Sequence, residues 1–251
     1  MSYYFKSFLI ICFIAIQTLS FAIDKDMEVY DANTTLVVGT SADFPPFEFI
    51  SNNKIIGFDI DIINIIAKEL NMNILIRDMK FYTLIPSLES GDIQIAIAGI
   101  AYTDERAKQI DLSTSYYSNK FAMLVVGEHD RINPIKPGMK IGVEEGSMME
   151  QWLKKQRIGI EMITMDSNTK LIKSLENNDL DGVLLDDVSA KAIIKSHPYT
   201  PFNLVALDNV EASGMSIGVM KNSPLLEQIN IILKQLHSNG EMAKLKTKWG
   251  L

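Results

Sequence analysis

The side chains that most often carry out enzyme chemistry are few in this chain and widely spaced. The three histidines, His129, His197 and His237, show no metal-ligand spacing. Cys12 is the only cysteine. No Gly-x-Ser-x-Gly elbow, Walker loop or dinucleotide-binding fingerprint is present. The sequence therefore gives no support for nucleophilic, nucleotide-dependent or metal chemistry, and we expect no cofactor and no bound metal.

Polar groups that could bind a ligand stand instead where predicted strands and helices meet. Gly146-Ser147-Met148 opens a predicted helix, so its backbone N–H groups and the positive end of its dipole can face an anion. A Ser147 that only caps the helix is the alternative, and the two roles are compatible. Asp186 and Asp187 lie at the rim where α/β sheets bind ligands. We assign Asp186 to the ligand and Asp187 to the cap of the next helix.

Strand-like and helix-like runs alternate from Thr35 onward and predict two α/β units. In the first unit, strands are predicted at 36–40, 73–76 and 93–97, and helices at 57–70 and 82–89. The pattern restarts after residue 138, with strands at 140–143, 161–164 and 182–185, and helices at 147–156, 168–177 and 188–195. Two amphipathic helices, 224–237 and 241–249, end the chain.

Two extended runs, 117–126 and 215–220, are placed to cross between the units. If both cross, the first unit is discontinuous and is completed by the C-terminal helices, and the crossings form a two-strand hinge. We therefore predict one lobe from residues 23–117 plus 213–251 and a second lobe from 118–212. A cleft should lie between them.

The N-terminus has the pattern of a secretory signal peptide over residues 1–22. Lys6 precedes an apolar stretch, and small residues before position 23 suit cleavage after Ala22. An uncleaved anchor is the alternative. Lipidation of Cys12 is disfavoured because Ile11 is bulky where lipoprotein processing requires a small residue. We predict export to the periplasm with a cleaved leader.

The chain is acidic, with a formal net charge of −7 that becomes −8 when Lys6 is removed with the leader. This balance argues against nucleic acid and anionic membranes as partners. A hydrophobic content of 47% with 22% charged residues is that of a globular protein.

Five motifs, in order and at consistent spacing, resemble the polar amino-acid-binding proteins of ABC importers. The motifs are Gly39-Thr40-Ser41-Ala42-Asp43-Phe44-Pro45-Pro46-Phe47-Glu48, Gly57-Phe58-Asp59-Ile60-Asp61, Leu84-Ile85-Pro86-Ser87-Leu88, Ala98-Gly99-Ile100-Ala101-Tyr102-Thr103-Asp104-Glu105-Arg106 and Asp181-Gly182-Val183-Leu184-Leu185-Asp186. The resemblance implies the type II periplasmic-binding-protein fold, two α/β lobes on a two-strand hinge that close over an amino acid. It also implies a monomer without enzymatic activity, whose partner is the membrane permease of an ABC importer.

The resemblance further implies how the amino acid's head group is held. Arg106, one turn into the helix after a loop at 98–103, would clamp the carboxylate, since a guanidinium can donate two parallel hydrogen bonds. Without the motif, an arginine solvated on this helix and paired with a neighbouring acid would be favoured. Backbone groups of Ala98 and Gly99 would add contacts, and Asp186 would accept from the ammonium. Ala101 replaces the family's usual hydroxyl residue, a loss of about 0.5–1.5 kcal/mol if uncompensated.

The walls of the implied site are aromatic, and its specificity stays open. Phe44 and Phe81 are expected to face the ligand, whereas Phe47 and Phe58 are expected in the core; Pro45-Pro46 should keep Phe44 out of a strand.

Ser41 and Glu144 bear on specificity. Glu144 either recognises a cationic side chain or is solvated at a strand end, so basic amino acids, glutamine-like amides and other polar residues remain candidates. If buried, Glu144 could instead act as the general acid of an enzyme on the same fold, similar to cyclohexadienyl dehydratase.

Overall fold

The structure, a computed structural model, describes residues 35–251 except for 131–133, 157 and 208–213. The predicted signal peptide, with Cys12, lies outside these residues. Within the described part of the chain, no helix has the length and apolarity needed to cross a bilayer.

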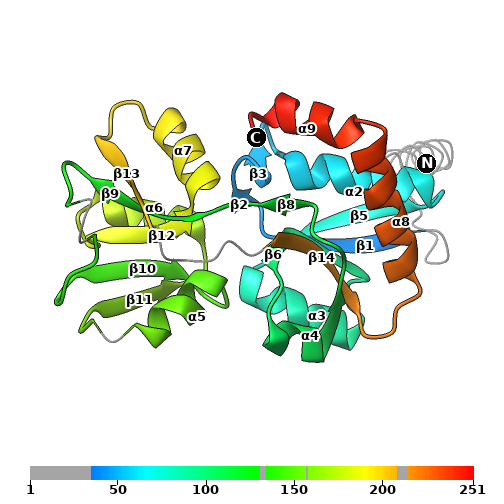
Figure 1. The fold of residues 1–251 in the computed structure, drawn as a ribbon, viewed down its shortest axis with the longest axis horizontal. Helices are drawn as coiled ribbons and strands as arrows, with labels where there is room; N and C mark the ends of the chain where they lie inside the picture. Colours follow the sequence, from blue (N-terminus) through cyan, green and yellow to red (C-terminus); the bar gives the residue numbers. More distant parts are fainter. Residues whose placement is uncertain (1–34, 131–133, 157, 208–213) are drawn as a thin grey trace, which may run out of the picture. The chain divides into compact units, whose positions relative to one another are not determined.

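A six-stranded sheet combines segments from both ends of the described chain (Figure 1). Its strands are β1 (Thr35–Thr40), β5 (Asn73–Asp78), β6 (Ile95–Ala101), β7 (Ile110–Leu112), β8 (Tyr117–Ser118) and β14 (Gly214–Met220). The strand order is β5-β1-β6-β14-β7, and β8 also pairs with β14. β1 runs parallel to β5 and β6, whereas β14 is antiparallel to its neighbours. We call this sheet, with the helices packed on it, the first lobe.

Helices cover both faces of this sheet, as the βαβ pattern predicts. Its helices are α2 (Phe58–Glu69), η1 (Phe81–Thr83), α3 (Leu84–Ser90), α4 (Asp104–Gln109), α8 (Leu225–Ser238) and α9 (Glu241–Trp249). Along β6, Ile95 and Ile97 share a buried cluster with α2, α8 and α9, while Ala96 and Ala98 share another with α3. The alternation follows from the two-residue period of a strand. The C-terminal helices thus complete a core that begins at β1.

A small three-stranded sheet precedes α2 and was missed from the sequence. It consists of β2 (Asp43–Phe44), β3 (Glu48–Ser51) and β4 (Lys54–Ile56). The turn between β3 and β4 is formed by Asn52 and Asn53, both at positive φ, as a tight hairpin turn requires. The expectation that the prolines exclude Phe44 from a strand is wrong, because Phe44 pairs with Glu48 at the end of an edge strand that the prolines follow.

The second lobe is built around a five-stranded sheet. Its strands are β9 (Phe121–Val126), β10 (Lys140–Glu144), β11 (Glu161–Met165), β12 (Gly182–Asp186) and β13 (Phe202–Ala206), in the order β11-β10-β12-β9-β13. Its helices are α5 (Met148–Lys155), α6 (Asn168–Glu176) and α7 (Asp187–Ser196). α6 and α7 pack with one buried cluster, and α5 packs with a second.

The two passages between the sheets differ from the predicted pair in one respect. The first passage lies between β8 and β9, inside the predicted run 117–126. The run 215–220, however, is part of β14, an interior strand of the first sheet with Ile217 and Val219 fully buried. Its apolar residues are therefore core residues, not hinge residues. The segment between β13 and β14 includes 208–213, which lie outside the described residues, and the predicted boundary at 212/213 lies there too.

Candidate functional site

A cavity lies between the two lobes and gathers most of the predicted binding residues. Those that line it are Ser41, Phe44, Phe81, Ala98, Gly99, Ala101, Arg106, Glu144, Ser147 and Met148. Other residues that line the cavity were not predicted to bind a ligand: Glu48, Asn119, Phe121, Met149, Asn168, Leu184, Leu185 and Met215. Most of these are apolar and belong to core strands or helices, so no sequence pattern separates them from ordinary core. Among the described residues, no cluster of His, Cys, Asp and Glu is arranged to hold a metal ion.

Arg106 is buried in the first turn of α4 and reaches both lobes. Its Nη1 donates to the carbonyl oxygen of Ala101 at 2.7 Å, and its Nη2 donates to that of Gly146, in the second lobe, at 2.9 Å. The guanidinium lies 5.4 Å from the ring centroid of Phe81, a cation–π contact. Burial lowers its pKa to about 10, and it remains a cation at neutral pH. The solvated-arginine alternative is wrong, because the side chain is only 3% exposed.

The backbone beside Arg106 is strand where the sequence predicted a loop. β6 continues to Ala101 because β14 pairs with it as far as Met215 and Ser216. Within it, Gly99 has φ of +57°, and a Cβ there would lie 3.1 Å from the ring of Phe44. Glycine therefore allows the Phe44 ring to lie against this strand.

Two buried acids, Asp59 and Glu48, lie next to each other near Gly99, and Asp59 binds the Gly99 backbone. Asp59 Oδ2 accepts from the Gly99 N–H at 3.1 Å and from the Tyr116 hydroxyl at 2.6 Å. Burial raises the Asp59 pKa to about 6, while these hydrogen bonds oppose the rise. Glu48 is also buried beside Asp59, and burial together with the Asp59 charge raises its pKa well above the usual range. Burial therefore favours the neutral form of both acids.

Glu144, at the end of β10, presents an acid to the cavity. Its Oε1 is buried and, among the described residues, meets no hydrogen-bond donor. Burial, and after it the charge of Asp43, raises the Glu144 pKa to about 8, against the opposing effects of Asn168, Lys80 and Arg106. The environment thus favours the neutral acid until a cation approaches it.

The N-terminus of α5 faces the cavity through its capping residues. Ser147 Oγ accepts from the Glu150 N–H at 3.1 Å, and Glu150 Oε2 accepts from the Gly146 N–H at 2.8 Å. This reciprocal arrangement resembles a capping box. It holds the Gly146 carbonyl, the partner of Arg106, at a fixed place in the second lobe.

The prediction for the two consecutive aspartates requires a correction. Asp186, not Asp187, caps α7, because its Oδ1 accepts from the N–H groups of Val188 at 3.0 Å and Ser189 at 2.8 Å. Asp187 instead pairs with Lys191 on the surface. Asp186 is fully buried and does not line the cavity. Burial raises its pKa to about 6, with opposing contributions from Ser189 and from Asn119, a cavity residue.

A cavity between two α/β lobes that are linked by the chain after β8 is the arrangement of a solute-binding protein. The model of the bacterial extracellular solute-binding proteins, family 3, matches residues 36–251. The chain belongs to this family. It is 32% identical over 218 residues to the arginine-binding extracellular protein ArtP of Bacillus subtilis, covering 85% of each chain.

Two solved structures extend the comparison. An ancestral arginine-binding protein bound to arginine shares 36% identity at a TM-score of 0.80, over 86% of this chain and 98% of that one. An ancestral amino-acid-binding protein described as a precursor of cyclohexadienyl dehydratase shares 28% identity at a TM-score of 0.79, over 86% and 96%.

Proposed function

We propose that this protein captures an amino acid with a cationic side chain, arginine foremost, outside the cytoplasm and delivers it to the permease of an ABC importer. The observation that carries the proposal is the presence of the Arg106 guanidinium and the buried Glu144 acid in one cavity. The first suits a carboxylate, and the second suits a cation. The named arginine-binding relatives support the same substrate class.

The head group of the ligand would be held from both lobes. A guanidinium has five N–H donors, and the carbonyls of Ala101 and Gly146 take up two of those on Arg106. The remaining donors can bind the ligand's carboxylate. Asp186 remains our candidate acceptor for the ammonium, and Asn119, which lowers its pKa, lines the cavity.

The side chain of the ligand would lie between Phe44 and Phe81 and end near Glu144. A neutral side chain leaves the Glu144 carboxyl protonated, whereas a guanidinium stabilises its ionised form at close range. Planar guanidinium groups also stack well on aromatic rings. The site should therefore prefer arginine to a neutral molecule of the same shape.

Dehydratase activity on the same fold is the competing function. The raised pKa of Glu144 would suit a general acid, and one structural relative is described as a precursor of such an enzyme. Incubation of the protein with prephenate or arogenate separates the two functions, since a binding protein leaves both unchanged.

The proposed function is tested by a thermal-shift screen of the twenty amino acids, followed by calorimetry with arginine and citrulline. Saturation at 100 times Kd adds roughly 2.7 kcal/mol, and we expect arginine to raise Tm by about 5–10 °C. Citrulline, its neutral isostere, should bind at least about tenfold more weakly. A chain that responds to no amino acid would contradict the proposal, and equal affinities would remove the role of Glu144.

A further inference from the structure

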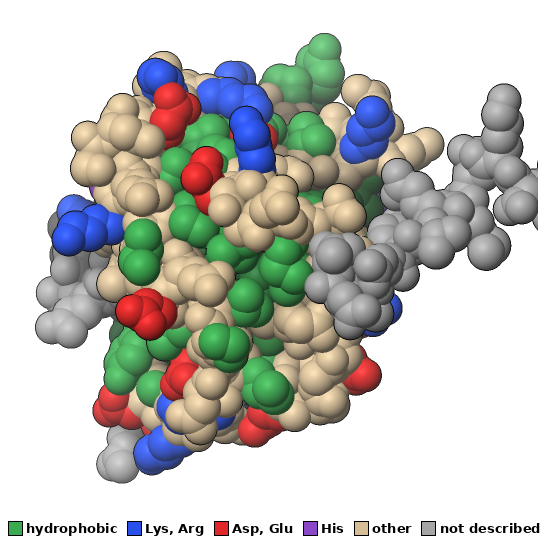
Figure 2. All heavy atoms as spheres, turned by 90° about the vertical axis from the view of Figure 1, so that its right-hand side faces the viewer, with side chains coloured by type: hydrophobic (Ala, Val, Ile, Leu, Met, Phe, Trp, Pro, Cys, Tyr) green, Lys and Arg blue, Asp and Glu red, His purple; other side chains and the backbone are tan. Residues whose placement is uncertain are grey.

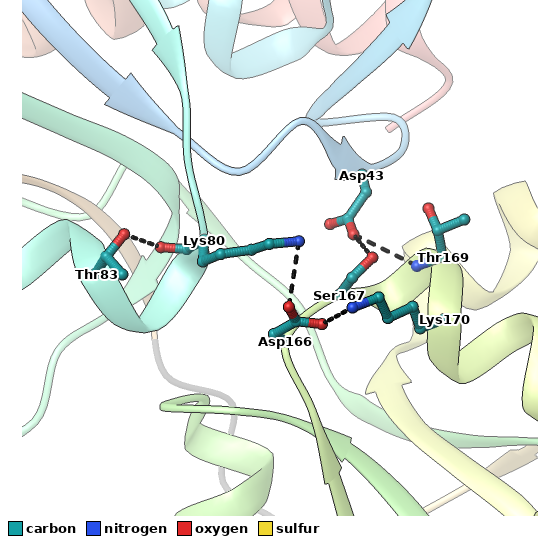
Figure 3. A network of polar contacts seen from close by, with 7 residues as sticks. All are labelled: Asp43, Lys80, Thr83, Asp166, Ser167, Thr169 and Lys170. Atoms are coloured by element: carbon teal, nitrogen blue, oxygen red, sulfur yellow. Dashed lines mark hydrogen bonds and ion pairs between the residues drawn. The ribbon is translucent and has the colours of Figure 1, made fainter.

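Asp43, in β2 of the first lobe, makes its side-chain contacts with the second lobe (Figure 3). Its Oδ2 accepts from the Ser167 hydroxyl at 2.6 Å and, more distantly, from the Thr169 N–H at 3.4 Å. Its Oδ1 lies 3.4 Å from the Asn168 side-chain nitrogen. All three partners belong to the start of α6.

Because of this contact, the carboxylate near the first turn of α6 comes from Asp43 and not from the helix's own N-cap residue. Ser167 occupies the N-cap position, yet its side chain accepts no hydrogen bond from the helix. Its hydroxyl donates to Asp43 instead, and the Asp43 carboxylate approaches the first turn in its place. A carboxylate at a helix N-terminus is favoured by both the free N–H groups and the helix dipole. The first lobe therefore supplies the acidic cap of a helix in the second lobe.

A second, weaker contact joins the lobes beside the first. Lys80 Nζ lies 3.5 Å from Asp166 Oδ2, and Asp166 Oδ1 also pairs with Lys170 of α6 at 2.7 Å. Figure 3 shows Asp43 and Asp166 on adjacent sides of the start of α6, with the Lys80 side chain extending toward Asp166 from the first lobe. The Lys80 pair is partly exposed, so it contributes little by itself.

Both contacts are continuous with the cavity. Ser41 and Phe44, on either side of Asp43 in the sequence, line the cavity, as does Asn168, which follows Ser167. Asn168 also lowers the pKa of Glu144, the acid in the same cavity. A separation of Asp43 from α6 would thus displace one wall of the cavity from the other.

We propose that Asp43 is a positioning residue that latches the lobes together around the ligand by capping α6 across the cleft, with Lys80 and Asp166 as an auxiliary pair. This inference rests on the proposed function, because closure matters only if the cavity binds a ligand. Asp43 touches no ligand in this scheme. It acts by slowing the opening of the lobes.

The latch is tested by the rates of arginine binding measured by stopped-flow fluorescence. In Asp43→Ala and in Ser167→Ala, we expect the dissociation rate to rise about tenfold and the association rate to change less than twofold. The double variant should resemble Asp43→Ala, since removal of Asp43 already removes the contact with Ser167. Lys80→Ala should raise the dissociation rate less than Asp43→Ala, and Lys170→Ala, which removes an Asp166 partner within the second lobe, should leave it unchanged.

An interlobe distance separates failure of the latch from failure of the proposed function. Fluorophores at Tyr199→Cys and Lys234→Cys, in a Cys12→Ser background, mark exposed sites on the two lobes. We expect Asp43→Ala to increase their separation even without a ligand. Unchanged separation and dissociation rates, or equal effects from Lys170→Ala, would overturn the latch. A wild type that binds no amino acid overturns the proposed function and leaves the distance measurement as the test of the latch.

Discussion

At the scale of single residues, the site depends on Arg106, whose side chain is buried and held in place by other groups of the protein. The carbonyls of Ala101 and Gly146 and the ring of Phe81 fix the Arg106 guanidinium. A clamp held in place loses little conformational entropy when a carboxylate binds. The same contacts make Arg106 part of the interface between the lobes.

Replacement of Arg106 should remove binding while the fold persists. In Arg106→Ala, we expect arginine affinity to fall at least about a hundredfold, because both the charge and the bidentate geometry are lost. Arg106→Lys should recover only a small part, since an ammonium cannot reproduce the planar fork. Calorimetry measures the affinities, and circular dichroism checks the fold. Near-wild-type affinity in the alanine variant would show that the carboxylate binds elsewhere.

Glu144 should make arginine binding depend on pH. Its pKa of about 8 means that the free protein carries a proton there at pH 7, and a cationic ligand favours its release. Affinity should therefore rise with pH from 6 to 8, by up to about tenfold per unit, and level off above 8. Calorimetry in buffers of different ionisation enthalpy should detect the released proton.

Glu144→Gln is the matched control for this pH dependence. The variant should lose the dependence and bind arginine and citrulline about equally. A pH dependence that survives in Glu144→Gln would assign the titration to another acid.

Single residues also mark the limit of sequence-based prediction. The presence of Arg106 in the cavity was predictable because its motif is specific, whereas the choice between Asp186 and Asp187 as the helix cap was not. Either aspartate can cap a helix that starts after a strand, and only the backbone geometry at Asp186, extended at φ −78° and ψ 157°, selects it. The raised pKa of Glu144 was equally invisible, because it depends on the charges of Asp43 and Arg106 in the other lobe as well as on desolvation.

At the scale of elements, the short helix α4 is what presents Arg106. It has six residues, too few for stability by itself, and Thr103 Oγ1 caps it by accepting from the Arg106 N–H at 3.1 Å. The capped backbone group belongs to Arg106 itself, the proposed clamp for the carboxylate. Helix capping and the proposed clamp therefore depend on one residue.

Loss of the α4 cap should weaken both stability and binding. For Thr103→Ala, we expect a loss of about 1 kcal/mol in the free energy of unfolding, a Tm lower by roughly 2–4 °C and a several-fold lower arginine affinity. Thr103→Ser keeps the hydroxyl and should retain both. Thermal melts and calorimetry on the same samples make the comparison. A destabilised variant with wild-type affinity would show that Arg106 is positioned without its cap.

The elements themselves were largely predictable, with informative exceptions. The helices and parallel strands follow from their apolar periodicity, and most bounds differ by only a few residues. The β2–β4 sheet was missed although Asn52-Asn53 is a hairpin signal, because its strands are short and only partly apolar. The 215–220 run forms an interior strand instead of the predicted crossing, because an extended apolar run does not reveal whether it crosses or pairs.

At the scale of the molecule, charge is dispersed over the surface. On the face drawn in Figure 2, acidic and basic side chains are interspersed among apolar ones. Exposed pairs such as Lys248 with Asp61 and Lys221 with Asp111 join distant parts of the first lobe. The two-lobe architecture was predictable from the restart of the βαβ pattern. The contacts across the cleft were not, because no local pattern records which residues meet when two lobes pack.

The interior position of β14 also bears on how the chain reaches its folded state. β14 separates β6 from β7 in the first sheet, and α8 and α9 cover that sheet, yet all three come from the last forty residues. During synthesis, the second lobe has its full set of strands and helices while the first still lacks an inner strand. The first lobe thus stays incomplete until the chain is nearly finished, so its core can close only after β14 has been made.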